Sequence, residues 1–370
     1  MEIELDSIPL IDHHCHTIVD NALGKDVKNL IRNTSEASEN YPLSDLKETL
    51  TFEYMKSYVN KVSNANCDSM KDLENLFSNI NYNNYVYKIF RDNNYAQLFV
   101  DTGFHPRQNI DLDEMSNITG TKVFPVLRIE KLAEDIKMDS SSFSEWWERI
   151  LENVKNARKN GYIGAKSIIA YRSGLKIEPV SLKDAKQAFQ SWGKKRLEND
   201  VLLNFLIWEI APILAEHNLP LQFHVGYGDS DTDLLKGNPL LLRCFIEEFT
   251  PKGLKLTLLH TYPYHREAGY LTSVYSGVYF DISLIIPLGA FGATRVMSEA
   301  LELAPLSRFL FASDAHTRPE LYGLGAELYR KALHDILYKI FKQNIITTDK
   351  VYNWAEMVLH QNAFNLYWRK

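Results

Sequence analysis

Two histidines separated by one residue follow the first short apolar run of this chain. They are His14 and His16, in the sequence Asp12-His13-His14-Cys15-His16. Alternate residues of an extended strand share a face, so both imidazoles can reach one point, as metal ligands do. The alternative is a pair of polar histidines at a strand end. The same alternation predicts that His13 and Cys15 face away, so we expect Cys15 to pack and not to bind metal.

Further candidate ligands each follow a short apolar run downstream. These runs are brief and rich in apolar or β-branched residues, which is typical of buried parallel strands. One such histidine is more often structural than a ligand, but the repetition favours a metal site at strand ends. The candidate metal ligands are His14, His16, Lys166, His224, His260 and Asp314.

Lys166 is the unusual member of this set, because a protonated amine repels a metal cation. It is either carboxylated to a carbamate that bridges two metal ions, or charged and bound to an anionic group of the substrate. Its neighbours Ala165 and Ser167 argue against an ordinary surface lysine. The bridging carbamate is the interpretation that we favour.

Asp314 has a second predicted role. A carboxylate that touches a metal-activated water can take its proton during attack and then pass that proton to the leaving group. Asp314 is therefore the predicted general acid and base, and Lys166 and His260 are the other predicted catalytic residues.

Polar residues that follow or end the expected strands are candidates for binding a substrate. Arg128 and Arg172 indicate a substrate carboxylate, since a guanidinium binds that group in a bidentate way. Tyr171 and Tyr227 complete the predicted substrate site. Further candidates, each of which is more often structural than functional, are Glu130, Asp229, His265, His316 and Arg318.

Eight segments have the character of strands, and helix-like stretches separate most of them. Eight βα units predict an α/β fold, a (β/α)8 or TIM barrel, as a single domain over residues 1–370. Catalytic groups of that fold stand at the carboxyl ends of the strands, where every candidate ligand falls. The expected strands are 9–16, 96–101, 122–128, 161–169, 220–225, 254–260, 278–282 and 308–314.

The segment 17–94 is far longer than a normal crossover between the first two strands. It is polar, with aromatic residues at intervals, which predicts packed helices. We expect a mostly helical cap over the barrel mouth that shapes substrate access. The alternative is a peripheral element for oligomerisation or stability. The stretch 321–370 is expected to be helical and to close the barrel.

The composition restricts the class of protein. A net charge of −6 and scattered Lys and Arg residues argue against a nucleic-acid partner and favour a small-molecule substrate. Three isolated cysteines, Cys15, Cys67 and Cys244, fit a reducing, cytoplasmic location. The acidic N-terminus and the lack of a long uncharged apolar run predict neither export nor membrane insertion. Whether the protein forms a homo-oligomer stays open.

The order of the candidate ligands resembles the amidohydrolase superfamily of metal-dependent hydrolases, over nearly the whole chain. The stretches 164–175, 222–229 and 258–264 look like the amidohydrolase half of FluG-type proteins. The resemblance implies a distorted (β/α)8 barrel, one or two divalent metal ions, usually zinc, and hydrolysis by a metal-activated hydroxide. It also assigns ligand roles to the six residues above, with the carboxylated lysine of the family at Lys166.

The predicted function is therefore a metal-dependent hydrolase of an amide or related C–N bond in a small, anionic substrate, for example a γ-glutamyl compound. The same superfamily contains decarboxylases, hydratases and uronate isomerases, so a lyase or isomerase with one metal ion is the alternative. A single metal ion and an uncarboxylated Lys166 would favour it. A non-catalytic protein on this fold would be expected to lack a ligand, and none is missing.

Overall fold

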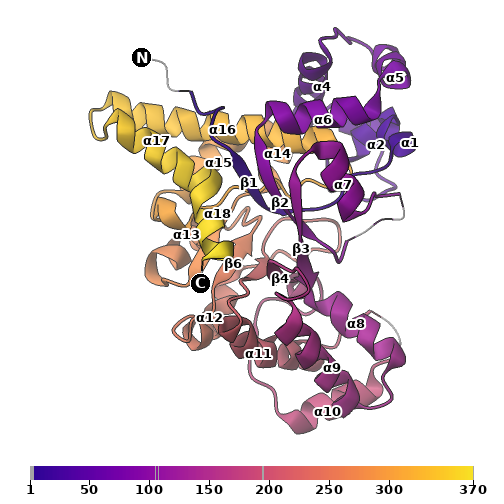
Figure 1. The fold of residues 1–370 in the computed structure, drawn as a ribbon, viewed down its shortest axis with the longest axis vertical. Helices are drawn as coiled ribbons and strands as arrows, with labels where there is room; N and C mark the ends of the chain where they lie inside the picture. The colour runs from indigo at the N-terminus through magenta and orange to yellow at the C-terminus, as the bar shows by residue number, and fades with distance from the viewer. Residues whose placement is uncertain (1–3, 105, 107, 194–195, 370) are drawn as a thin grey trace.

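Seven parallel strands form the central sheet of the protein (Figure 1). The computed structural model describes residues 4–104, 106, 108–193 and 196–369. Within them, each strand pairs with the next along the chain, as in a TIM-barrel-like α/β fold. The strands are β1 (Leu10–Cys15), β2 (Tyr95–Asp101), β3 (Lys122–Arg128), β4 (Gly164–Ser167), β5 (Leu221–His224), β6 (Leu256–Leu259) and β7 (Val278–Phe280).

The expected eighth strand, 308–314, lies between β7 and β1 but is not a regular strand. On one side, the backbone N–H of Leu310 donates to the carbonyl of Phe280 at 3.0 Å. On the other side, the N–H of His13 donates to the carbonyl of Phe311 at 3.3 Å. The segment therefore connects the two outer strands of the sheet with few ladder bonds.

The irregularity has a physical cause, because other groups take up the backbone donors of this segment. The N–H of Phe311 donates to the carbonyl of Val358 at 3.2 Å, and the N–H of Ser313 donates to the Asp12 carboxylate at 3.0 Å. Asp314 has a φ of 50°, outside the range of a strand. The prediction of a regular strand at 308–314 was wrong, although its place in the sheet was as expected.

Helices occupy the connections between the strands and most of the chain after β7. Most crossovers carry at least one helix, as parallel pairing requires. The helices after β2 are α7 (Leu112–Thr119), α8 (Ile129–Asp139), α9 (Phe143–Asn156), α10 (Leu182–Ser191), α11 (Asp200–Glu216), α12 (Arg243–Phe249), α13 (His265–Val274), α14 (Ile285–Gly289), α15 (Ala293–Ala300), α16 (Pro319–Lys342), α17 (Thr348–Glu356) and α18 (Asn362–Trp368), with short turns η1 (Ile169–Tyr171), η2 (Pro239–Leu242), η3 (Ala290–Gly292), η4 (Leu306–Arg308) and η5 (Met357–Gln361).

The long segment between β1 and β2 is folded into six helices. Side-chain caps define several of their starts, such as Thr49 before α4 and the reciprocal capping box of Ser69 and Asp72 before α5. Figure 1 shows this group at one end of the molecule, and α4 and α6 pack on α16. The helices are α1 (Asn21–Gly24), α2 (Val27–Arg32), α3 (Leu43–Lys47), α4 (Leu50–Ser63), α5 (Met70–Asn79) and α6 (Tyr82–Asp92).

Arg318 links these helices to the segment that precedes α16. Its guanidinium is fully buried and donates to Glu320 at 2.9 and 2.7 Å. It also donates to the carbonyl of Leu23 at 3.3 Å and lies 5.3 Å from the ring centre of Phe77. Arg318 does not line the pocket described below, and its charge serves a buried ion pair, the structural role that is more common for such a residue.

We expect Arg318→Met to lower the free energy of unfolding by about 3–5 kcal/mol, because the Glu320 carboxylate would stay buried without its partner. Urea denaturation followed by circular dichroism measures this loss. The exposed pair of Lys331 and Asp335 provides the control, and Lys331→Met should change stability by less than about 1 kcal/mol. Equal effects of the two substitutions would contradict the anchoring role of Arg318.

The C-terminal helix packs against buried side chains of the first three strands. Leu366 and Tyr367 of α18 pack with Ile11, Phe99 and Val126, from the first three strands, in a cluster that is separate from the main core. The expected helical stretch 321–370 contains α16, α17, η5 and α18, and its last residue lies outside the described residues. Within the part of the chain that the structure describes, no helix is long and apolar enough to cross a membrane.

Candidate metal centre

The six predicted ligands lie together at the carboxyl ends of the strands. Asp314 is central: its Oδ1 lies 3.2 Å from Nε2 of His14 and 3.4 Å from Nε2 of His16, and its Oδ2 lies 3.2 Å from Nδ1 of His260. The Nζ of Lys166 lies 3.2 Å from Nε2 of His14. The ring of the sixth residue, His224, is centred 4.6 Å from that of His260.

Three of these residues have the arrangement of a metal-binding set. One ligand atom from each of His14, His16 and Asp314 lies within 4.8 Å of the others, and all three residues are buried. Within the described protein, His16 Nδ1, His224 Nε2 and Asp314 Oδ1 are buried without a hydrogen-bond partner. Buried polar atoms are rarely left unpaired, so the donor set fits a cation at this position.

Local backbone geometry turns two of these side chains into the cluster. His260 and Asp314 have φ values of 67° and 50°, in the left-handed region that residues other than glycine rarely adopt. Such conformations cost roughly 1–3 kcal/mol each and concentrate at functional sites. Gly226 follows β5 with a φ of 70°, and a Cβ there would meet the carbonyl of Tyr262 at 2.2 Å. Only glycine therefore allows the chain to turn so closely after His224.

Burial keeps the nitrogen ligands in the uncharged form that a metal ion needs. It lowers the pKa of His14, His224 and His260 well below the usual value, and the charge of Lys166 adds to the effect. Burial also lowers the pKa of Lys166 to about 8, and it raises the pKa of Asp314. An amine with a lowered pKa is more often neutral, and only the neutral amine can react with carbon dioxide to form a carbamate.

A pocket of about 500 Å³ opens over this cluster. Its floor contains five of the six ligands, and Tyr171, whose ring lies 4.2 Å from that of His224, forms part of its wall. Arg128 and Arg172 also line it, whereas Tyr227 does not and reaches the backbone of Glu36. The volume suits a small molecule.

A family model described as amidohydrolase matches residues 164–367. This chain belongs to the amidohydrolase family. The chain is an enzyme of the hydrolase type, and the match covers Lys166, His224, His260 and Asp314.

Known proteins are similar to this amidohydrolase over nearly its full length. A solved structure from Lactobacillus casei, described as a candidate metal-dependent hydrolase, is 40% identical with a TM-score of 0.91, and the match covers 98% of this chain and 96% of that one. Protein fluG of Emericella nidulans is 27% identical, over 97% of this chain and 45% of that protein. The chain thus spans less than half the length of this relative. A uronate isomerase from Thermotoga maritima shares the fold, with 13% identity, a TM-score of 0.70, and coverage of 98% and 95%.

We expect the metal-free amidohydrolase to lose stability as the pH falls below about 6.5, the usual pKa of histidine. Above that pH, His14, His224 and His260 are neutral in both states. Below it, only the unfolded chain takes up the protons, because the folded pKa values are lowered. Each histidine therefore contributes at most about 1.4 kcal/mol of lost stability per pH unit.

Urea denaturation in the presence of a chelator, repeated across this pH range, measures the slope. His224→Asn should reduce the slope, because it removes one of the three histidines with a lowered pKa. A stability that does not vary between pH 7 and pH 5 would contradict the expectation.

The two arginines predicted to bind a substrate carboxylate already have carboxylate partners in this enzyme. Arg128 donates through Nε to Asp101 at 2.9 Å and makes a second, close contact through its terminal nitrogen. Arg172 donates to Glu134 at 2.9 Å and to the carbonyl of Leu197 at 2.7 Å. Both arginines line the pocket, and Nε of Arg172 is buried without a partner, so an anionic substrate stays a prediction.

Two of the further candidates have structural roles. His265 forms an ion pair with Glu299 at 2.8 Å and does not line the pocket. Glu130 is buried, and it accepts hydrogen bonds from the hydroxyl of Ser167 at 2.6 Å and from the N–H of Ile168 at 2.9 Å. These bonds hold the chain directly after Lys166. Asp229 and His316, by contrast, do line the pocket.

Sequence reasoning missed Glu36, which lines the pocket from the helical segment 17–94. Its carboxylate lies 3.3 Å from Nε2 of His316. Burial alone would lower the pKa of His316, but this contact raises it. Asp101 was also missed, although it ends β2 in the same way as the candidate ligands end their strands, and that position was a usable signal.

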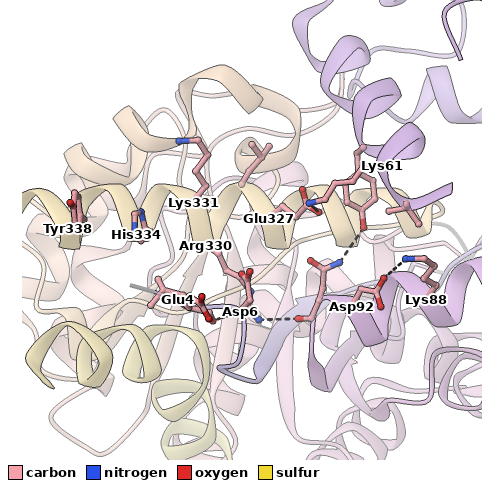
Figure 2. Close-up of a pocket in the computed structure, with 15 residues that line it drawn as sticks. Glu4, Asp6, Lys61, Lys88, Asp92, Glu327, Arg330, Lys331, His334 and Tyr338 are labelled. Carbon is pink, nitrogen blue, oxygen red and sulfur yellow. Dashed lines mark hydrogen bonds and ion pairs between the residues drawn. The ribbon is translucent and has the colours of Figure 1, made fainter. Parts of the chain in front are cut away.

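A second cavity, larger than this pocket, lies elsewhere (Figure 2). It has a volume of about 1160 Å³ and is formed by the N-terminal segment, α4, α6 and α16. Lys61 pairs with Glu327 at 2.6 Å, and Arg330 donates to the carbonyls of Ile8 and Asn93. Among the described residues, none that lines this cavity has a buried polar side-chain atom without a hydrogen-bond partner, in contrast to the smaller pocket.

Proposed function

We propose that this enzyme hydrolyses an amide or related C–N bond of a small polar substrate, with a divalent metal ion held by the six clustered residues. The observation that supports it best is the convergence of unpaired acceptor atoms. One ligand atom each of His14, His16 and Asp314 lies within 4.8 Å of the others, and His16 Nδ1 and Asp314 Oδ1 are buried beside the pocket without a hydrogen-bond partner. Buried polar atoms are rarely left without a partner, and imidazole and carboxylate groups are the ligands that a divalent cation takes in such sites.

The metal ion and the side chains of the protein have separate roles in the proposed reaction. Zinc, the proposed metal, lowers the pKa of a bound water to near neutrality and so supplies a nucleophile. Asp314 takes the proton of the attacking water and then gives it to the leaving nitrogen as the C–N bond breaks. His260, 3.2 Å from the carboxylate of Asp314, holds that carboxylate in place. Lys166, as a carbamate, would help to hold two such ions.

The fold proposed for this site is a (β/α)8 barrel in a single domain, with residues 308–314 as its irregular eighth strand. The hydrogen bonds of this segment to both β7 and β1 support that closure. We propose that residues 17–94 act as a cap over the mouth. The contribution of Glu36 to the pocket and its contact with His316 support this role.

We also propose a cytoplasmic location for the protein. The three cysteines, Cys15, Cys67 and Cys244, are free, which fits a reducing compartment.

The test combines metal analysis with substrate screening. The protein is expressed with zinc and bicarbonate, metal per subunit is measured by elemental analysis, and a crystal structure shows the state of Lys166. Amides, γ-glutamyl compounds and lactones are then assayed beside uronates, with neutral and anionic members of each class. Two ions, a carbamate on Lys166 and release of an amine support the proposal.

Other outcomes would favour a different function. One ion, a free Lys166 and conversion of a uronate would favour the isomerase alternative, which the shared fold of the uronate isomerase permits. Protein that binds no divalent metal would overturn the proposed function altogether.

A further inference from the structure

Gln222 lies directly behind the metal ligand His14. It is fully buried on β5, and its side-chain oxygen is 2.9 Å from Nδ1 of His14. Its side-chain nitrogen donates to the carbonyl of His13 and to the hydroxyl of Tyr367, both at 2.8 Å. Both polar atoms of this amide are therefore hydrogen-bonded. Their partners are His13 and His14 near the N-terminus and Tyr367 near the C-terminus.

These contacts determine the orientation of the Gln222 amide. A backbone carbonyl only accepts hydrogen bonds, so the group that faces the carbonyl of His13 must be the amide nitrogen. The amide oxygen then faces His14, and since an oxygen accepts, Nδ1 of His14 must carry the proton. In the neutral ring, Nε2 is left with a lone pair, 3.2 Å from Asp314.

Tyr367 of α18 supports this orientation from the other side. Its hydroxyl accepts from Gln222 and lies 3.2 Å from Nδ1 of His13. Nε2 of His13 lies 2.9 Å from the carboxylate of Asp281, which accepts the ring proton. Nδ1 of His13 can then accept from the hydroxyl of Tyr367. The donor and acceptor roles of all the groups in this buried hydrogen-bond network are therefore mutually consistent.

We propose that Gln222 and Tyr367 are positioning residues that fix the tautomer of His14 and so present its Nε2 to the metal. Partners behind the ligands of a metal commonly orient the ring and raise its basicity, and their loss costs 10- to 100-fold in affinity. The proposal rests on the metal site of the proposed function and not on the reaction that the enzyme performs.

The test is zinc affinity, measured by competition with a chromophoric chelator. Gln222→Met cannot accept from His14, and we expect zinc to bind about 10- to 100-fold more weakly. Gln222→Glu keeps an acceptor at the same place and should restore part of that affinity. Tyr367→Phe leaves the bond between Gln222 and the carbonyl of His13 intact, so its loss should be smaller.

A matched control separates positioning from general damage to the core. Tyr329 is also fully buried, and its hydroxyl donates to the carbonyl of Leu310 at 2.9 Å, away from the ligands. Tyr329→Phe should leave zinc affinity unchanged. An affinity of Gln222→Met within about twofold of the wild type, or an equal loss in Tyr329→Phe, would overturn the proposal.

Nitrogen NMR of labelled histidines in the metal-free protein provides a second readout. We expect Nδ1 of His14 to be protonated in the wild type and the two tautomers to mix in Gln222→Met. This measurement stays decisive even if the wild type binds no zinc, which would overturn the proposed function instead. A wild-type His14 protonated on Nε2 would overturn the positioning role.

Discussion

Asp314→Asn should lose about a thousandfold in kcat/KM, within the range for removal of a positioned acid–base group. The asparagine oxygen can still lie beside His14 and His16, so the shape of the cluster is retained. It cannot accept the proton of the attacking water or return it to the leaving nitrogen. Burial raises the pKa of Asp314, which makes the native carboxylate the stronger proton acceptor.

Steady-state kinetics on the substrate identified by screening, with zinc content matched between variants, measures this loss. The control is Asp113→Asn, at an exposed site on α7, which should retain the activity of the wild type. If Asp314→Asn with a full complement of zinc keeps more than about a tenth of the activity, Asp314 does not act as the acid and base.

Removal of the metal should abolish activity and destabilise the fold. We expect dialysis against a chelator to reduce turnover to background and zinc to restore it, because the nucleophile depends on the ion. A ligand at 100 times its Kd stabilises the native state by about 2.7 kcal/mol, so added zinc should also raise the Tm of the metal-free protein. Scanning calorimetry with and without zinc measures that shift.

The variant His14→Ala, His16→Ala separates specific binding from general effects of zinc. It removes two of the three closest ligand atoms, and we expect neither activity nor a rise in Tm on addition of zinc. Full activity in wild-type protein shown by elemental analysis to hold no metal would exclude a metal-dependent reaction.

The sequence predicted the location of the ligands well because of a simple geometric rule. Parallel strands end at one edge of a sheet, so polar residues that end successive strands must meet there, as His14, Lys166 and His224 do. The regular eighth strand could not be excluded in advance. Its donors are taken by Asp12 and by a carbonyl of η5, and no local pattern in the sequence shows such distant partners.

The substrate-binding residues were harder to predict for the same reason. Arg128 and Arg172 have the chemistry to bind an anion, but Asp101 and Glu134 lie 27 and 38 positions away and already neutralise them. Gln222 had the appearance of an ordinary strand residue two positions before His224. Only the approach of Tyr367, 145 positions later, reveals its place behind the metal site.

The hydrogen bond between His13 and Tyr367 joins positions 354 residues apart. Contacts of such long sequence separation form late and slow the folding of a domain. During synthesis, at about 5–20 residues per second, the ribosome releases the first ligand long before the helix that supports it. The proposed metal site would therefore form last, and the appearance of tight metal binding in a refolding experiment would report when α18 docks.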